Sequence, residues 1–348
     1  MAQDVSHNGE DNQDQSLSSL SKGTVLSVDP PRADFKHRTK NSSNTKTSYN
    51  PPNPPNTLFD MLYSIQLYAK IWTVAQAELS KDNMMNLDIL FWAASESDNI
   101  DMYRVAISHA RTSMKHHIRP DHSTTHVAVF DPKTGTLKTK LTNQGYSNDS
   151  AWARGQAWAI AGFAQTYHWT QDCEFLQAAE DCAGYFLDHL TDNYVPPWDF
   201  TAPHVPGETI PPDTSAGVIA AYGMLLVHEA HLARGDTSRY LQEAINLLAG
   251  ISKAKLNPPS WFVAVQDHSS VDTVENSYGI STTADGIRVE NNGSPQTILG
   301  GATINNYEFA PRRWADHGLV YADYYFLLAG NKLLEMEVAG SLKSILVG

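Results

Sequence analysis

The sequence predicts an all-α fold of helical hairpins closed into an α/α-barrel, with short strands confined to the loops. Apolar residues recur at helical spacing in long stretches from Leu58 onward. These stretches fall into pairs joined by long loops that carry Trp, Asp, His and Gly. No period of about 33 to 45 residues repeats, so the common thin solenoids are not supported. A barrel of helical hairpins fits these three observations best.

The elements follow from the local patterns in chain order. Residues 1–56 are rich in Asn, Ser, Asp, Lys and Pro and lack a hydrophobic period, which predicts a disordered polar tail before a single domain over 57–348. Strand-like alternation is limited to 125–131 and 260–267, beside turn signals. The predicted helices span 57–79, 84–96, 100–117, 152–169, 173–190, 214–233, 237–253 and 317–336.

Composition narrows the class of protein. The chain has 348 residues, 41% of them hydrophobic, and a formal net charge of -13, so nucleic acid is not an expected partner. Cys173 and Cys182 stand nine apart in one predicted helix, about 13 Å at the helical rise, and cannot bridge each other. The first residues show no signal-peptide pattern. A cytoplasmic protein without membrane association is predicted.

Familiar catalytic signatures do not occur in the sequence. There is no GxGxxG after a strand, no Walker loop, no HExxH, no GxSxG and no paired CxxC. His116 and His117 are adjacent near a predicted helix end, where a surface feature is favoured over a ligand pair. Neither a metal nor a cofactor is expected.

The stretch "NDSAWARGQAW" combines a turn-like start with two tryptophans and an arginine. Asp149 or a neighbour is expected to cap the helix, while Trp152 and Trp158 belong either to the core or to a ligand platform. Arg154 is followed by Gly155, whose missing Cβ would let a ligand approach the guanidinium. That arrangement suits bidentate recognition of a carboxylate.

The stretch "DNMMNLDILFWAA" places an aspartate at a helix entrance beside an apolar surface. Desolvation favours the neutral form of such a carboxyl group, as a general acid near neutral pH requires. Asp82 is therefore either a general acid or a helix cap, and Asp88 is either solvent-facing or the next candidate.

The stretch "NYVPPWDFTAPH" is a proline-fixed loop that presents Trp198 and Asp199. Such a loop is typical both of sugar-stacking rims and of loops that pin two helices together. Both interpretations of Trp198 stay open.

Several motifs taken together resemble the unsaturated glucuronyl hydrolases, glycoside hydrolase family 88. The motifs occur in the family's order over about 82–336: "DNMMNLDILFWAA", "THVAVFDPKTG", "NQGYSNDSAWARGQAWAIAGF", "VPPWDFTAP", "DTSAGVIAAYGMLL" and "GLVYADYYFLLAGNKLL". The resemblance implies an (α/α)6 toroid that needs no metal. It also implies a substrate, an oligosaccharide left by a polysaccharide lyase, whose terminal unsaturated (C4=C5) glucuronyl residue is removed.

The family's chemistry is hydration of a vinyl ether. A carboxylic acid protonates C4, water attacks C5, and the resulting hemiketal opens and expels the rest of the oligosaccharide. One carboxyl group can donate the proton and then, ionised, activate the water. Carried over by motif, Asp82 matches this acid–base. The positions that match substrate contacts are His126, Gln144, Trp152, Arg154 and Trp158, with Trp198 added from its loop.

Two departures from the family pattern bear on activity. The family's second aspartate, in an H-D-x-G-F motif upstream of the acid–base, has no counterpart, and residues 1–81 lack the expected hairpins, so roughly the N-terminal third of the toroid is missing or replaced. Pro212 stands where the family commonly has the arginine of R-D-[ST]-S-A. An incomplete barrel would expose apolar helix faces and provide a surface for self-association.

Two alternative functions are kept from the sequence. One is a related hydrolase of unsaturated rhamnogalacturonan products, which the motif WARGQ at residues 152–156 disfavours. The other is a truncated, non-catalytic remnant that binds carbohydrate through Trp152, Trp158 and Trp198.

Overall fold

The computed structural model describes residues 78–80, 83–259, 261–265, 271–273, 276–280, 286–290 and 295–338, all within one compact unit, Ser48–Gly348. The predicted polar tail and nearly all of the predicted helix 57–79 lie outside the described residues. Positions 78 and 79 belong to strand β1 (Glu78–Ser80) and not to a helix, because they pair with Val129 and Ala128.

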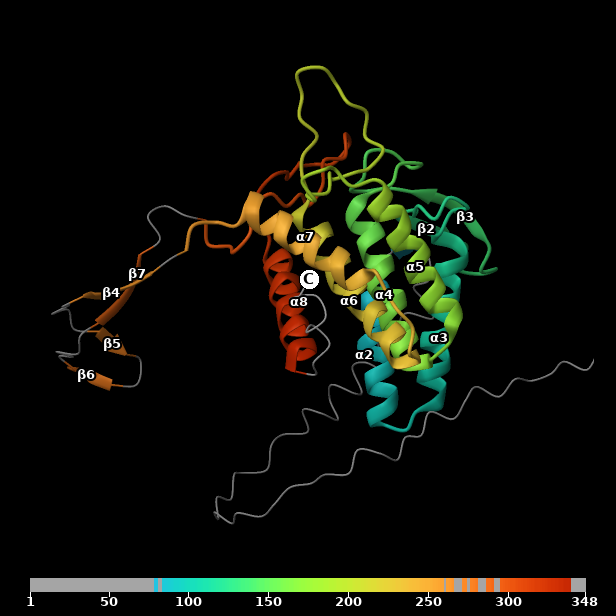
Figure 1. The fold of residues 1–348 in the computed structure, drawn as a ribbon, viewed down its shortest axis with the longest axis horizontal. Helices are drawn as coiled ribbons and strands as arrows, with labels where there is room; N and C mark the ends of the chain where they lie inside the picture. The colour runs from blue at the N-terminus through green and yellow to red at the C-terminus, as the bar shows by residue number, and fades with distance from the viewer. Residues whose placement is uncertain are drawn as a thin grey trace, which may run out of the picture. The chain divides into compact units, whose positions relative to one another are not determined.

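The described part of the chain contains seven helices, each matching a predicted one (Figure 1). Their bounds differ from the predicted bounds by at most a few residues, as is usual for frayed ends. The helices are α2 (Asn83–Glu96), α3 (Ile100–His117), α4 (Ala153–Thr170), α5 (Cys173–Asp188), α6 (Thr214–Arg234), α7 (Tyr240–Lys255) and α8 (Val320–Val338).

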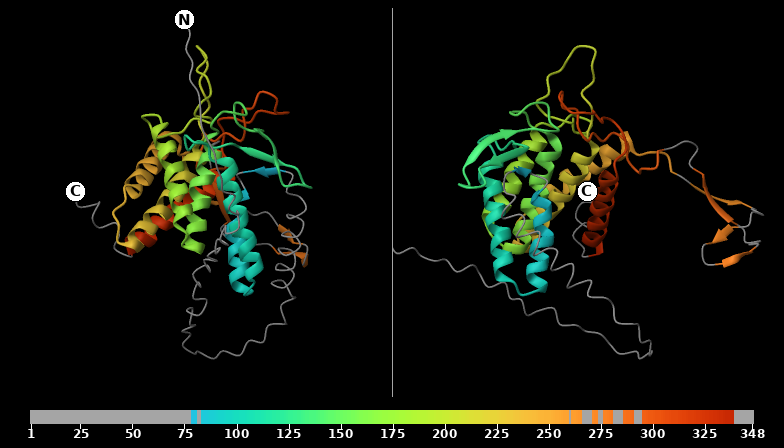
Figure 2. Two further views of the ribbon diagram at one scale, coloured as in Figure 1. Left: turned by 90° about the vertical axis from the view of Figure 1, so that its right-hand side faces the viewer. Right: turned by 180° about the vertical axis from the view of Figure 1, so that it is seen from behind.

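Helices α2, α4, α6 and α8 lie side by side and run parallel (Figures 1 and 2). Each neighbouring pair makes contacts in the same order along both helices. These contacts are Met84–Gly162 and Phe91–Trp169 for α2 and α4, Arg154–Asp213 and Ala161–Gly223 for α4 and α6, and Tyr222–Tyr325 and Glu229–Lys332 for α6 and α8.

Helices α3, α5 and α7 return antiparallel to α2, α4 and α6. Phe163 stacks on Phe175, and Gln156 donates to the Cys182 carbonyl, so α5 reverses along α4. The described helices therefore form three complete hairpins and the first helix of a fourth. This arrangement confirms the predicted hairpin fold and accounts for part of a six-hairpin toroid.

Helix α6 is the centre of the packing because it contacts α4, α5, α7 and α8. Its length and apolar composition would suit a membrane span, but 67% of that window is buried within the protein, as a central core helix requires. Small residues let its neighbours approach closely. A Cβ at Gly223 would lie only 2.7 Å from the Ala161 backbone nitrogen.

The strands form small antiparallel sheets. β1 pairs with β2 (Val127–Phe130), which pairs with β3 (Leu137–Leu141); β4 (Trp261–Val265) pairs with β7 (Gly286–Glu290), and β5 (Val271–Thr273) with β6 (Asn276–Ile280). The predicted strands 125–131 and 260–267 are confirmed as β2 and β4. The sequence of β3, LKTKL, gave no signal because its first three residues are exposed.

Both cysteines lie in α5 and no disulfide joins them, as their spacing predicted. Cys173 is exposed and Cys182 is buried.

The close crossing of α4 and α6 can be tested with glycine substitutions. Gly223→Ala should lower the free energy of unfolding by about 1–3 kcal/mol, because backbone atoms of α4 would have to move. Gly184→Ala in α5 is the matched control: a Cβ there meets nothing within 4 Å in the part of the chain that the structure describes, so stability should rise by up to about 1 kcal/mol. Urea denaturation measures both, and a neutral Gly223→Ala would contradict this packing.

A second test concerns the buried His109 of α3. Burial lowers its pKa from 6.5 to about 4, so between these values the unfolded chain holds the proton that the folded chain lacks. Stability should fall as the pH drops from 6.5 to 4, by on the order of 3 kcal/mol from this residue. In urea denaturation at several pH values, His109→Gln should flatten the fall in unfolding free energy between pH 6.5 and 4, whereas His204→Gln, at an exposed position, should not. The same fall in the His109→Gln variant and the parent would exclude His109 as its cause.

Candidate active site

Long loops converge at the N-terminal ends of α4, α6 and α8. Residues 118–152 precede α4, 189–213 precede α6, and the described segments 256–259 and 295–319 precede α8. An isolated bridge joins the first two loops, Trp152 with Asp199, while the bridges Pro197–Pro212 and Ala302–His317 each lie within one loop. Because the parallel helices point their amide-bearing ends the same way, their dipoles make this end favourable for an anion.

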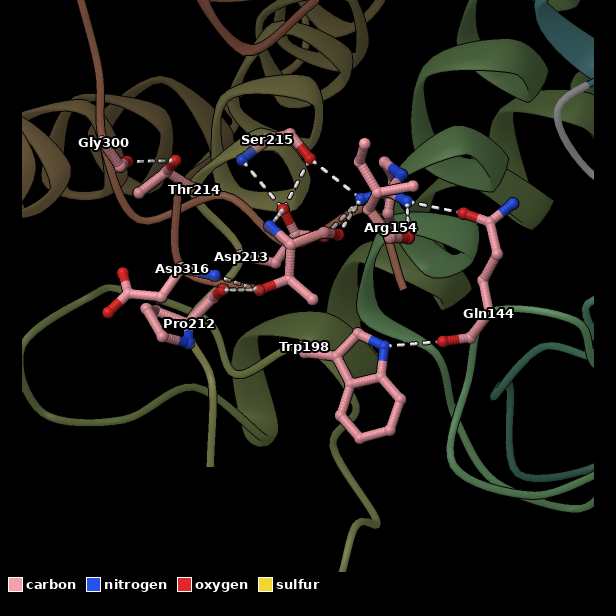
Figure 3. A network of polar contacts seen from close by, with 11 residues as sticks. Gln144, Arg154, Trp198, Pro212, Asp213, Thr214, Ser215, Gly300 and Asp316 are labelled. Atoms are coloured by element: carbon pink, nitrogen blue, oxygen red, sulfur yellow. Dashed lines mark hydrogen bonds and ion pairs between the residues drawn. The ribbon is translucent and has the colours of Figure 1, made fainter. Parts of the chain in front are cut away.

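An ion pair between Arg154 and Asp213 lies at the centre of these loops (Figure 3). Arg154 Nη1 is 2.7 Å from Asp213 Oδ2, and the two side chains are 3% and 0% exposed. Nη1 also donates to Ser215 Oγ and the Thr303 carbonyl, while Nη2 donates to the Ile304 carbonyl and Gln144 Oε1. The guanidinium therefore binds α6, the segment before α8 and the loop before α4.

Asp213 serves two purposes, because it also caps α6. Its Oδ1 accepts hydrogen bonds from Ser215 N, Ser215 Oγ and Thr303 N. Complete burial raises the pKa of Asp213, and the charge of Arg154 and these hydrogen bonds oppose the rise. Arginine stays protonated inside proteins. Removing Asp213 would therefore leave the buried Arg154 guanidinium without its counter-charge.

The structure corrects the reason given for Gly155. A Cβ there would lie 2.7 Å from Cε3 of Trp152, so the glycine makes room for the indole and not for a ligand. Trp152 is 2% exposed, its ring lies 4.7 Å from the Arg154 guanidinium carbon, and His126 packs on it at 4.2 Å. Trp152 is thus a buried support between two polar candidates.

Gln144 lies between Arg154 and Trp198 (Figure 3). Its Oε1 accepts from Arg154 at 2.7 Å, and its carbonyl accepts from Trp198 Nε1 at 2.7 Å. Since Arg154 only donates, the side-chain NH2 of Gln144 points away from it, and no described residue accepts a hydrogen bond from it. Trp198 is 2% exposed, so in this structure it pins the loops together and does not present an open stacking face.

The buried carboxylate of Asp199 organises the loop that carries Gln144. Its Oδ2 accepts from Tyr146 N at 2.9 Å and from Ser150 Oγ at 2.6 Å. Asp149 is exposed and does not cap α4, contrary to the prediction, nor does a neighbour. Trp152 occupies the N-cap position, but its side chain makes no capping hydrogen bond. Its backbone instead pairs with Asp199 in a strand-like bridge just before the helix.

The remaining candidates, Trp158 and Asp88, lie further along α4 and α2. Trp158 is partly exposed, one turn after Arg154, and makes an edge contact with Tyr325 of α8 at 5.3 Å. Asp88 is partly buried and accepts a hydrogen bond from Trp169 Nε1 at 2.7 Å, so it is not a purely solvent-facing residue.

Asp82, the predicted acid–base, lies outside the described residues. Its surroundings are described on both sides: Ser80 pairs with Val127, the residue after His126, and Asn83 begins α2. Among the described residues no group of three or more His, Cys, Asp or Glu side chains is placed to hold a metal ion.

Parallel inner helices, antiparallel outer helices and loops gathered over one end define part of an (α/α)6 toroid. The crystal structure of unsaturated glucuronyl hydrolase from Bacillus sp. GL1 has this fold, with a TM-score of 0.60, 22% identity, and coverage of 81% of this chain and 69% of that one. An unsaturated glucuronyl hydrolase specific for heparin gives a TM-score of 0.56 at 28% identity, covering 75% and 60%.

Sequence comparison points the same way. The chain is 36% identical over 182 residues to the unsaturated glucuronyl hydrolase of Formosa agariphila, covering 51% of this chain and 45% of that protein. It is 37% identical over 165 residues to the unsaturated chondroitin disaccharide hydrolase of Streptococcus pyogenes serotype M1, covering 47% and 40%. No family model matches the chain. The resemblance is confirmed, and the chain spans less than half the length of these curated relatives.

The buried ion pair can be tested by removing one partner. Asp213→Ala should lower the free energy of unfolding by about 3–5 kcal/mol, because the guanidinium stays buried without its counter-charge. The control is Asp101→Ala, which breaks the exposed Arg104–Asp101 pair and should cost less than about 1 kcal/mol. Similar losses of unfolding free energy in the two variants, measured by urea denaturation, would show that the buried pair contributes no more to stability than the exposed one.

Proposed function

We propose that this chain is a glycoside hydrolase of the unsaturated glucuronyl hydrolase type. It would remove the terminal unsaturated glucuronyl residue from lyase-generated oligosaccharides by hydrating the C4=C5 double bond. The observation that carries the proposal is the gathering of His126, Gln144, Trp152 and Arg154 at the N-terminal ends of parallel helices in a toroid of this class. The names of the similar proteins support the same substrate class.

Asp82 is the proposed acid–base. Two residues before it, Ser80 pairs with Val127, the neighbour of His126, and α2 begins at the residue after it, Asn83. In the reaction its carboxylic acid would transfer a proton to C4 of the vinyl ether while positive charge develops at C5 and the ring oxygen. The ionised carboxylate would then take a proton from the water that attacks C5. The hemiketal formed would open and release the rest of the oligosaccharide.

The described residues suggest how an anionic sugar would be held. Gln144 keeps its NH2 donors for a hydroxyl or carboxylate group, since its oxygen is bound to Arg154. Trp158 is partly exposed and offers an aromatic surface. Arg154 would act mainly by fixing Gln144 and Trp152, because Nη1 and Nη2 are both bound within the protein and its side chain is 3% exposed.

The activity test follows the ultraviolet absorbance of the C4=C5 bond in unsaturated chondroitin and heparin disaccharides. The full chain should remove the absorbance, and Asp82→Asn should abolish turnover without changing the helical content in circular dichroism. Asp101→Asn, on the exposed face of α3, should behave as the parent. Turnover retained by Asp82→Asn would move the acid–base role elsewhere, with Asp88 as the next candidate.

A non-catalytic carbohydrate-binding remnant is the second candidate. The absence of an H-D-x-G-F motif favours it, because the family's second aspartate has no counterpart here. Folded protein that binds the disaccharide in calorimetry but leaves its absorbance intact would select this candidate. A cytoplasmic location and self-association through exposed helix faces stay predictions.

A further inference from the structure

A groove of about 550 Å³ lies between α7 and α8. Its lining is largely apolar: Ile245, Leu248, Ala249 and Ser252 from α7, and Phe326, Leu327, Gly330, Asn331, Leu333 and Leu334 from α8. Leu327 and Leu334 are 54% and 60% exposed. A continuous apolar strip of this kind normally marks a binding surface.

Gly330 supplies a second observation. It stands inside α8, where glycine costs about 0.5–1 kcal/mol relative to alanine, and a Cβ there would meet nothing within 4 Å among the described residues. The described helices therefore give no packing reason for this glycine. Close approach of another backbone over the groove would supply one.

The chain that follows α8 has the sequence needed to fill the groove. Residues 339–348, AGSLKSILVG, continue directly from Val338 and lie outside the described residues. Gly340 comes two residues after the last helical residue, where glycine commonly ends a helix and reverses the chain. Leu342, Ile345 and Leu346 then fall at i, i+3 and i+4, one face of a short helix, with Lys343 off that face.

The lengths also match. Residues 341–348 would form a helix of about 12 Å, the same rise that separates Phe326 from Leu334 along α8. We propose that residues 341–348 fold back antiparallel to α8 and occupy the α7–α8 groove through Leu342, Ile345 and Leu346. This segment would be the outer member of the fourth hairpin, as α7 is of the third.

Such a segment would support the candidate site from a distance. Asp323 of α8 accepts hydrogen bonds from the Ile298 and Leu299 amides, which lie four to six residues before the carbonyls of Thr303 and Ile304 that bind Arg154. Holding α8 in place therefore helps to hold that segment. The proposal does not depend on the proposed enzymatic activity.

A cysteine pair tests the contact in the full chain. In a Cys173→Ser background, Ala249→Cys with Ile345→Cys should form an intramolecular disulfide at least tenfold faster than the control pair, Ala249→Cys with Lys343→Cys. Mass spectrometry of the monomer identifies the link. Equal rates would overturn the proposal, and disulfide-linked dimers would show that a second copy of the chain occupies the groove instead.

Hydrogen exchange gives a measurement that does not rely on cross-linking. The double variant Leu342→Asp with Leu346→Asp should speed amide exchange in 245–252 and 326–334 severalfold, while Lys343→Asp should leave it unchanged. Circular dichroism first confirms that both variants keep their helices. Unchanged exchange in the double variant, or equal acceleration in both, would contradict docking of the tail.

Discussion

The ion pair between Arg154 and Asp213 is the interaction on which the arrangement of the site loops depends. Two charges removed from water are stable only when their remaining donors and acceptors are bound as well, and here α6, the loop before α4 and the segment before α8 supply those partners. A shift of any one of them would leave a buried polar group unpaired. The charges therefore fix three parts of the chain relative to one another.

The hairpin packing explains why those parts meet at one end of the helices. Alternate helices of a hairpin array run the same way, so the loops that precede the inner helices are brought together although they are far apart in sequence. Close crossings such as Ala161 against Gly223 keep α4 and α6 in register, which places Arg154 opposite Asp213. The chemistry at the helix ends thus depends on small residues in the helix middles.

Sequence patterns predicted the helices well because amphipathic periodicity is a local signal. Helix α3 was predicted with both ends correct, the other helix ends differ by a few residues, and the last residues of the predicted helix 57–79 pair as β1 instead. The site was predicted less well. Arg154 was recognised as unusual and Asp199 was noted beside Trp198, but the buried roles of Asp213 and Asp199 were not predicted, because their partners lie 59 and 49 positions away, a distance at which no spacing rule applies. The cap of α4 was misassigned for the same reason, since a bridge to Asp199 replaces it.

The hydrogen bonds from Arg154 to the Thr303 and Ile304 carbonyls join positions 149 and 150 residues apart. Each hairpin can form from neighbouring residues, whereas these bonds require closure of a very long loop, and that entropy must be recovered before the contact is stable. Among the hydrogen bonds of the described residues, these two join the most distant positions in the sequence. The site would therefore be completed late in folding, after the hairpins that carry it have formed.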